Sequence, residues 1–554
     1  MRRRGRPRVA APLAVAAILA APLTVAAASP CLAVAAVDSA PSLVAAARKP
    51  AAPPEGKPPA AAAKPLSPTA SLEKRVREVK LGNGMRFLLL RRGTAPVFAG
   101  ILRFKVGSAD DPGGETGLAH LFEHMAFKGT STIGVTDAAK ERPILDALDG
   151  VARDLNAEID RGPRADAARL DALRAKMKSL MEEHRALVVR DEFSEILSEN
   201  GGTGINASTG TDMTSYYVSL PANRIELWCL LEAARLKDPV LREFYSERDV
   251  VKEERRFRID NQPQGKLYEQ LLLTAYSAHP YRVPGAGWLS DLDRLTRPAA
   301  EAFHREHYVP GNAVGALVGQ IDPDATAALL ERYFGSIPPG PLPLSTPTVE
   351  PPQTGERRVS VQFDAAPNLM IGFHKTALED PQDPVYEVID SILGGGRTSR
   401  LFRKLVTGSQ VASNVFTFEA PGRRFPSLFV IGGQPRAPHT TAEMEQGILE
   451  ELRRLGEEPV SEQELAKVRA QIESDAIYEL RGNMGLAGQL TQFAVLTGDW
   501  RNMIRRDEQL KAITAAQVQE VARQTFTAAN RTIASLERAA SDDAPAGAPP
   551  GKGR

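Results

Sequence analysis

The chain has 554 residues, more than a single hydrophobic core usually holds, so we expect two or three domains. Hydrophobic residues make up 43% of it and charged residues 25%, as in an ordinary globular protein. Without the five arginines of the N-terminal segment, the net charge of +1 becomes −4, so nothing indicates a nucleic-acid partner.

The first 36 residues have the pattern of a bacterial secretory signal peptide. Arginines from Arg2 to Arg8 precede an apolar run from Val9 to Ala28, and small residues suited to cleavage follow. We expect removal on export, which places the mature chain in the periplasm or outside the cell. The Ala- and Pro-rich run makes a stable membrane span less favourable. The charged-then-apolar order disfavours an organelle transit peptide, and Pro30 disfavours a lipid anchor at Cys31.

A linker and then a first domain are predicted next. Residues 37–72 are rich in Ala, Pro and Lys, which is typical of a disordered or semi-extended linker. The domain over 73–337 begins with strands, because Gly82-Asn83-Gly84 is a hairpin turn signal between apolar runs. A further strand is predicted over Phe98–Val106.

The segment His120-Leu121-Phe122-Glu123-His124 is the most informative feature of the chain. Residues four apart project from one face of an α-helix, so His120 and His124 can reach one metal ion. The order H-x-x-E-H reverses the commoner zinc signature, and only about 0.01 occurrences are expected by chance. Glu123 is close enough to hydrogen-bond a metal-bound water, take its proton and later give it to a leaving amine. A catalytic zinc usually has three protein ligands, so one is still to be found.

Residues 138–190 have a helical pattern of their own. Apolar residues recur at three- and four-residue steps in two runs, and Arg161-Gly162-Pro163 separates the runs. This predicts an antiparallel helical hairpin that projects from the first domain. It could dock a partner, and a solvated helical spacer is an equally good interpretation.

The best candidates for the third ligand lie in a charged segment, Ser246–Arg256. Glu247 and Glu254 are two helical turns apart, so they share a face of the predicted helix. Composition alone favours the alternative, a solvated charged helix held by ion pairs.

The second half repeats the order of the first without a metal motif. A Pro-rich linker over 338–354 precedes a second domain over 355–540, which begins with period-two alternation from Arg357. Gly394-Gly395-Gly396 then leads into a helix. The polar, Pro/Gly-rich tail over 541–554 is predicted to be disordered.

The stretch His120–Thr130, HLFEHMAFKGT, resembles the pitrilysin/insulinase family of zinc metallopeptidases, the inverzincins, and in particular its bacterial mitochondrial-processing-peptidase-like members. The resemblance implies one Zn²⁺ per chain, and the family's E-x6-E pattern falls on Glu247 and Glu254. Glu254 is then the third ligand, and Glu247 is a second carboxylate that orients a ligand and tunes the site. Glu253, one helical step round, ranks below Glu254. Over about residues 75–540, further matching pieces are Gly204–Thr209, His279–Tyr281 and Tyr308–Ala313.

The resemblance also implies the fold. It is an α+β fold of two related α/β-sandwich domains, each an antiparallel-rich sheet with helices on one face, arranged as half of a clam. The helical hairpin is then an insertion in the first domain. Asn206 and Ala207 lie on a sheet edge near the zinc and contact the backbone of an extended substrate. The alternative for Asn206 is a turn residue after Gly202-Thr203-Gly204.

The chain departs from the family in its second half. Self-sufficient members carry an Arg and a Tyr there, which help to bind substrate and to stabilise the tetrahedral intermediate, and Val406 and Ser413 occupy these positions here. A preorganised donor of this kind is worth roughly 3–4 kcal/mol of barrier. We therefore expect a partner, either a paralogous non-zinc subunit in a heterodimer or a second copy in a homodimer. The alternative is that Arg397 or Arg403 replaces the cation, which requires either side chain to project differently from the family residue.

The leading prediction is a zinc-dependent endopeptidase that cleaves peptides or unfolded polypeptides in an enclosed chamber. Glu123 activates the metal-bound water in this reading. One alternative is a non-catalytic structural or assembly subunit of a peptidase-like complex, which the intact H-x-x-E-H and E-x6-E patterns disfavour. Another is a zinc-dependent binding module, in which Glu123 has no purpose.

Overall fold

The computed structural model describes residues 72–345 and 348–538. The predicted signal peptide, almost all of the predicted linker over 37–72 and the tail over 541–554 lie outside the described residues. None of the helices in the described part combines the length and the hydropathy that a membrane span needs.

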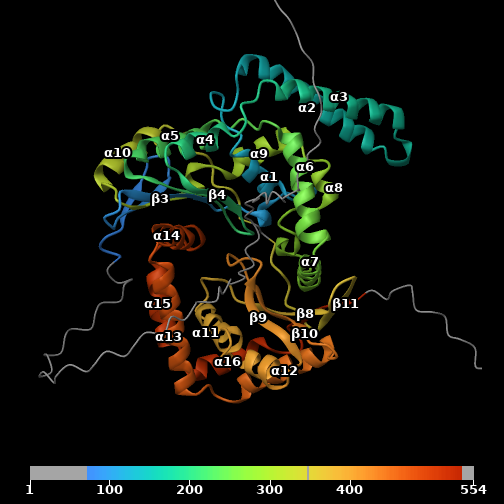
Figure 1. Cartoon of the computed structure of the whole chain (residues 1–554), viewed down its shortest axis with the longest axis vertical. Helices are drawn as coiled ribbons and strands as arrows, with labels where there is room; N and C mark the ends of the chain where they lie inside the picture. The colour runs from blue at the N-terminus through green and yellow to red at the C-terminus, as the bar shows by residue number, and fades with distance from the viewer. Residues whose placement is uncertain (1–71, 346–347, 539–554) are drawn as a thin grey trace, which may run out of the picture.

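The described residues form two β-sheets, one in each half of the chain (Figure 1). The first contains β1 (Arg77–Lys80), β2 (Arg86–Arg91), β3 (Val97–Phe104), β4 (Thr203–Thr209), β5 (Thr214–Pro221) and β6 (Ala313–Gly319). The second contains β7 (Arg357–Phe363), β8 (Asn368–Lys375), β9 (Ala412–Ala420), β10 (Ser427–Pro435) and β11 (Arg531–Arg538). Their orders are β1-β2-β6-β3-β5-β4 and β7-β11-β8-β10-β9, antiparallel except for the pairs β2 with β6 and β7 with β11.

Helices cover both sheets. The first half holds α1 (Leu118–Met125), α2 (Ala138–Ile159), α3 (Ala167–Arg185), α4 (Glu192–Glu199), α5 (Ile225–Lys237), α6 (Phe244–Arg255), α7 (Pro263–Ala275), α8 (Leu289–Leu292), α9 (Arg297–His307) and α10 (Pro323–Phe334). The second half holds α11 (Asp383–Gly394), α12 (Thr441–Glu457), α13 (Glu462–Glu479), α14 (Asn483–Thr497), α15 (Asn502–Ala512) and α16 (Ala515–Thr525).

Each sheet is covered on one face by helices of its own half and on the other face by a helix of the opposite half. In β2, Phe87 and Leu89 belong to the core under the first-half helices, whereas Leu88 and Leu90 pack with α14. Two buried faces explain why this strand is a continuous apolar run rather than an alternating one. Conversely, α7 packs on β7, β8 and β11 of the second sheet. In Figure 1, α14 lies below the first sheet and α7 lies above the second.

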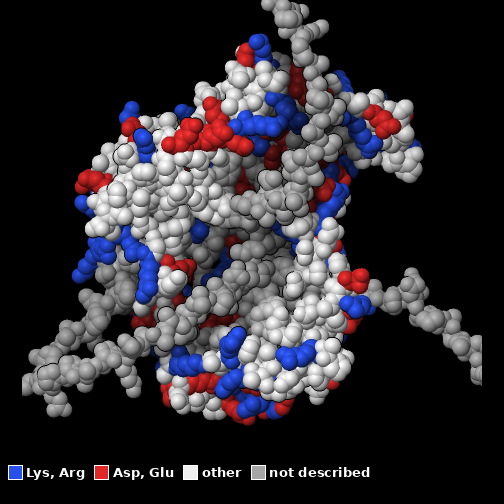
Figure 2. Space-filling view, in the orientation of Figure 1, with Lys and Arg blue, Asp and Glu red and all other residues white. Residues whose placement is uncertain are grey.

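The predicted α+β fold with two sandwich domains is confirmed, and so is the helical hairpin. Helices α2 and α3 pack against each other, and Asp137 and Asp166 cap their N-termini. The hairpin extends away from the body at the upper right of Figure 1. The space-filling view shows a hollow between the upper and the lower half (Figure 2).

Candidate metal centre

Helix α1, which carries the H-x-x-E-H motif, begins at a fixed backbone turn. The Asp111 carboxylate accepts hydrogen bonds from the backbone N–H of Gly117 (2.7 Å) and of Ala119 (2.8 Å), the first orphan donors of the helix. Gly117 has φ +89°, and a Cβ there would meet the Ala286 carbonyl oxygen at 2.8 Å. The glycine and the half-buried Asp111 carboxylate together set where α1 starts.

The side chains of His120, His124 and Glu254 converge where α1 packs against α6. Their ligand atoms all lie within 4.8 Å of one another. Glu254 Oε2 is 3.6 Å from His120 Nε2 and 3.9 Å from His124 Nε2, too far for hydrogen bonds. Two ligands at 2.0–2.2 Å from one tetrahedral zinc are separated by roughly 3.4 Å, so this spacing fits a shared ion. Glu254 Oε2 is also buried and accepts no hydrogen bond from the protein, as expected of an atom that holds a metal.

Glu247 fixes the orientation of the second histidine. Its Oε2 lies 3.4 Å from His124 Nδ1, and its Oε1 accepts a 2.5 Å hydrogen bond from Lys128 Nζ. With Nδ1 facing this carboxylate, His124 presents Nε2 to Glu254. Burial alone would raise the pKa of Glu247, but the hydrogen bonds and charges of His124 and Lys128 lower it to about 2. Glu247 is therefore ionised at neutral pH.

His120 is a neutral imidazole at neutral pH. Burial, with a smaller contribution from the nearby His124 and Arg258, lowers its pKa to about 3. A neutral imidazole has the free lone pair that a metal ligand needs. The Arg258 guanidinium lies 3.7 Å from Glu254 Oε2, one helical turn beyond that ligand.

Glu123 lies beside the three candidate ligands and is only 7% exposed. Burial raises its pKa, while a hydrogen bond with Thr209 of β4 and the charge of His124 act in the opposite direction. A carboxylate with a raised pKa is a stronger base than an exposed one, which suits transfer of a proton from water.

Asn206 and Ala207 lie on β4, the last strand of the first sheet, against which α1 packs. The turn alternative for Asn206 is therefore wrong. The Asn206 side chain accepts a 2.8 Å hydrogen bond from the Ala207 backbone N–H, and both residues pair with β5. The other edge of β4 pairs with no strand of the described residues, so an added strand could bind there.

In the second half, the positions of the family's Arg and Tyr carry small side chains. Val406 lies in a π-helical turn, Phe402–Gly408, and packs against the core of the second half. Ser413 is exposed on β9 and donates a 3.1 Å hydrogen bond to the Gln434 carbonyl. Neither residue can supply a cation or a phenol.

The structure thus brings together every residue that the sequence nominated for the metal and for proton transfer, while their chemical roles stay predictions. The contacts that Lys128, Arg258 and Thr209 make at the site were not predicted from the sequence. Lys128 lies four residues after the motif, but nothing in a lone lysine signals its contact with a residue more than a hundred positions later.

Comparisons with known proteins point to one family. The description "Insulinase (Peptidase family M16)" matches residues 87–161, and "Peptidase M16 inactive domain" matches residues 294–472. A Helicobacter pylori protein named zinc protease PqqE is 26% identical over 83% of this chain and 92% of its own. An uncharacterised zinc protease of Mycobacterium leprae is 24% identical over 76% of this chain and 82% of its own.

Solved structures share the fold. The crystal structure of a protease from Helicobacter pylori has a TM-score of 0.70 at 24% identity and covers 84% of this chain and 99% of its own. The first half of the periplasmic protease PqqL from Escherichia coli has a TM-score of 0.62 at 16% identity and covers 84% of this chain and 92% of its own.

Proposed function

The chain belongs to the pitrilysin/insulinase family, peptidase family M16, and from that premise we propose that it is a zinc-dependent endopeptidase. The observation that carries the proposal is the convergence of His120, His124 and Glu254 beside the buried base Glu123. Two imidazoles and one carboxylate are a common ligand set of catalytic zinc in peptidases.

Different residues of the site have different roles in peptide hydrolysis. A zinc ion held by His120, His124 and Glu254 would supply Lewis acidity toward the scissile carbonyl and toward the attacking water. Glu123 accepts the proton of that water and passes it to the departing amine. The hydrogen bond from Thr209 keeps the Glu123 carboxyl oriented between β4 and the ligands.

The substrate is proposed to be an extended peptide or an unfolded polypeptide. Because β4 ends its sheet next to α1, a peptide that adds as a further strand would pass Asn206 and Ala207 and approach Glu123. In a folded protein most extended segments already pair within a sheet and are not free to add in this way. The hollow between the two halves is where such a segment would lie (Figure 2).

We further propose that the active unit contains a second subunit. Val406 and Ser413 leave the wall opposite the metal without the cation and phenol of self-sufficient family members. A non-zinc paralogue would supply that pair, or a second copy of this chain would close the chamber. One solved relative is itself described as the first half of a protease.

An envelope location, periplasmic or extracellular, is proposed from residues 1–36 alone. Fractionation of the bacterium, with mass spectrometry of the mature N-terminus, tests it. A chain that keeps its first residues and stays with the cytosol would contradict it.

The deciding experiment is hydrolysis of a quenched, unstructured peptide by the purified mature chain, with zinc measured in the same sample. Glu123→Gln should keep zinc and lose about 10²–10⁴ in kcat. Glu254→Gln should lose the zinc itself. Glu253→Gln is the matched control, because that carboxylate is exposed and pairs only with Arg256 among the described residues.

The outcomes separate the proposals. Turnover by the chain alone, absent in Glu123→Gln, would support the peptidase and refute the need for a partner. A zinc-loaded chain that becomes active only with a co-purified paralogue would support both. A zinc-loaded chain that stays inert with every paralogue would favour the non-catalytic subunit.

A further inference from the structure

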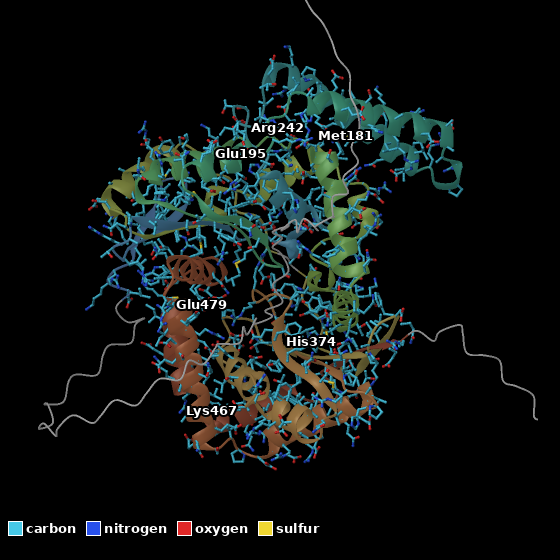
Figure 3. All side chains as sticks on the ribbon, viewed as in Figure 1. Met181, Glu195, Arg242, His374, Lys467 and Glu479 are labelled. Atoms are coloured by element: carbon cyan, nitrogen blue, oxygen red, sulfur yellow. The ribbon has the colours of Figure 1, made fainter. Side chains whose placement is uncertain are left out.

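The helical hairpin meets the rest of the first half at a buried charge cluster. Glu141 of α2 and His184 of α3 are each 2% exposed, and Arg242, two residues before α6, is fully buried. Glu141 Oε1 lies 2.9 Å from His184 Nε2 and accepts a 2.7 Å hydrogen bond from Arg242 Nε. Figure 3 places Arg242 and Met181 at this junction. A guanidinium buried to this degree is costly unless all its donors are used.

The remaining N–H groups of Arg242 donate hydrogen bonds to the loop that follows α1, the helix that carries the motif. It donates to the backbone carbonyls of Lys128 (3.1 Å), Thr130 (2.5 Å) and Ile133 (2.9 Å). The loop wraps closely around the guanidinium, since a Cβ at Gly129 would lie 3.3 Å from it. Arg242 therefore ties this loop to the hairpin.

The same loop presents the Lys128 side chain to α6. Lys128 Nζ lies 2.5 Å from Glu247 Oε1 and 3.3 Å from Glu243 Oε2. Glu247 in turn faces His124 Nδ1. A continuous line of polar contacts runs from the hairpin through Arg242 and Lys128 to Glu247 and His124.

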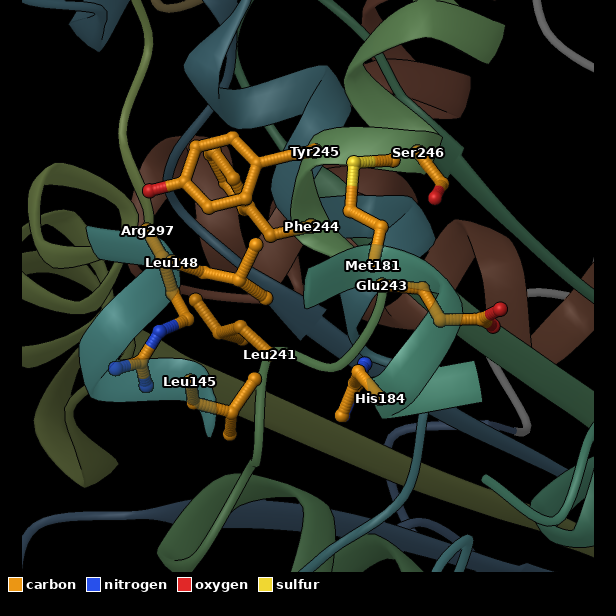
Figure 4. A pocket seen from close by; sticks show the side chains of 10 residues that line it. All are labelled: Leu145, Leu148, Met181, His184, Leu241, Glu243, Phe244, Tyr245, Ser246 and Arg297. Atoms are coloured by element: carbon orange, nitrogen blue, oxygen red, sulfur yellow. The ribbon is translucent and has the colours of Figure 1, made fainter. Parts of the chain in front are cut away.

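Apolar contacts dock the hairpin on the first turn of α6 as well. Leu148 of α2 and Met181 of α3 lie against Phe244 and Tyr245, around a small cavity (Figure 4). The Tyr245 hydroxyl donates a 3.0 Å hydrogen bond to Asp149 of α2. Helix α6 carries both Glu247 and Glu254. The hairpin therefore contacts α6 directly and the loop after α1 through Arg242, and these two elements must keep their relative positions at the metal centre.

We propose that the hairpin is a brace for the metal centre, and that Arg242 and Lys128 are positioning residues that hold Glu247 against His124. This inference rests on the metal site of the proposed function. It assigns the hairpin a role other than a solvated spacer or a docking arm. If Lys128 is removed, the carboxylates of Glu243 and Glu247 lose the cation they share, and Glu247 has no fixed position from which to orient His124.

The test measures metal binding by the full mature chain, independently of turnover. Zinc affinity is determined by competition with a chelator, and the visible absorption of the Co²⁺-loaded protein reports ligand geometry. Lys128→Met and Arg242→Met should each lower zinc affinity about 10–100-fold and shift the cobalt bands, while Lys128→Arg should restore both. If Arg242→Met does not fold, the comparison of Lys128→Met with Lys128→Arg still tests the proposal.

Two variants serve as matched controls. Lys252→Met removes another lysine with two carboxylate partners, itself 18% exposed against 19% for Lys128. Arg506→Met removes a buried arginine that pairs with two carboxylates in the second half. We expect both control variants to leave the zinc affinity and the cobalt spectrum unchanged. Equal effects of test and control variants, or wild-type affinity in folded Lys128→Met, would overturn the brace. A wild-type chain that binds metal but cleaves no peptide, even when every paralogue is added, overturns only the proposed function, and one that binds no metal overturns both.

Discussion

Asp390, on α11 of the second half, is a carboxyl group whose ionisation we expect to destabilise the fold. Its Oδ1 is buried and accepts no hydrogen bond. Burial is the largest cause that raises the pKa of Asp390, the charges of Glu419 and Glu387 add to the rise, and Thr417 and Lys375 oppose it; together these groups bring the pKa from 3.8 to about 6. The folded state therefore holds this proton more tightly than the unfolded chain does, and stability falls as the pH rises from about 4 to about 6.

The magnitude follows from the shift. One pKa unit corresponds to 1.36 kcal/mol, so a rise of about two units costs about 3 kcal/mol of unfolding free energy above pH 6. Asp390→Asn removes the ionisation and keeps the size. Urea denaturation should show that Asn at this position is about 2.5 kcal/mol more favourable, relative to wild type, at pH 7.5 than at pH 4, because the carboxyl of the unfolded chain is already partly ionised at pH 4.

The comparison between the two pH values cancels whatever the amide does on its own. Asp475→Asn, on the exposed side of α13, is the matched control. If the difference between Asp390→Asn and wild type is the same at both pH values, the carboxyl does not titrate as its burial implies, and the reasoning fails.

Three further results are expected. Arg255→Met should lower the unfolding free energy by about 3 kcal/mol in urea denaturation, because it removes the 2.7 Å partner of the buried Glu269 carboxylate and leaves that carboxylate with Lys266 alone, and a loss under 1 kcal/mol would contradict this. Gly422→Ala should lower the unfolding free energy by about 1–3 kcal/mol, because the added Cβ would meet the Tyr281 hydroxyl at 2.5 Å. Faster proteolysis between the halves should accompany this loss, and an unchanged digestion pattern would contradict the prediction. Free zinc at 100 times its Kd should stabilise the wild type by about 2.7 kcal/mol and His124→Ala by almost nothing, and equal calorimetric shifts in both would exclude His124 as a ligand.

The local part of the metal centre could be predicted from the sequence because helical geometry alone decides it. His120, Glu123 and His124 share one short helix, so their spacing already places them on one face. The Glu254 helix is a different case. Its composition favoured a solvated surface helix, and only the family pattern placed Glu254 at the metal. Its half-buried position arises from packing against α1, which the helix's own residues do not encode.

The contacts that support the centre could not be predicted because they join distant parts of the chain. Arg242 meets Glu141 across 101 positions of sequence, and Lys128 meets Glu247 across 119. A charged residue in a charged segment gives no signal of which partner it will find, or whether it will be buried. The sequence therefore predicts only a projecting arm or spacer for the hairpin, although its base is tied through Arg242 to the loop after α1.

The exchange of helices between the halves shows why a linker in the sequence is not always a boundary between independent cores. The run of three leucines in β2 implies that both faces of the first sheet are covered, but it cannot say by what. The cover is α14, a helix whose buried residues, among them Leu486, Leu490 and Phe493, come from the far side of the Pro-rich linker. The second sheet receives α7 in return. Each half therefore needs the other to complete its core. The packing of α14 on the first sheet and of α7 on the second, and not the linker alone, holds the two halves on either side of the hollow.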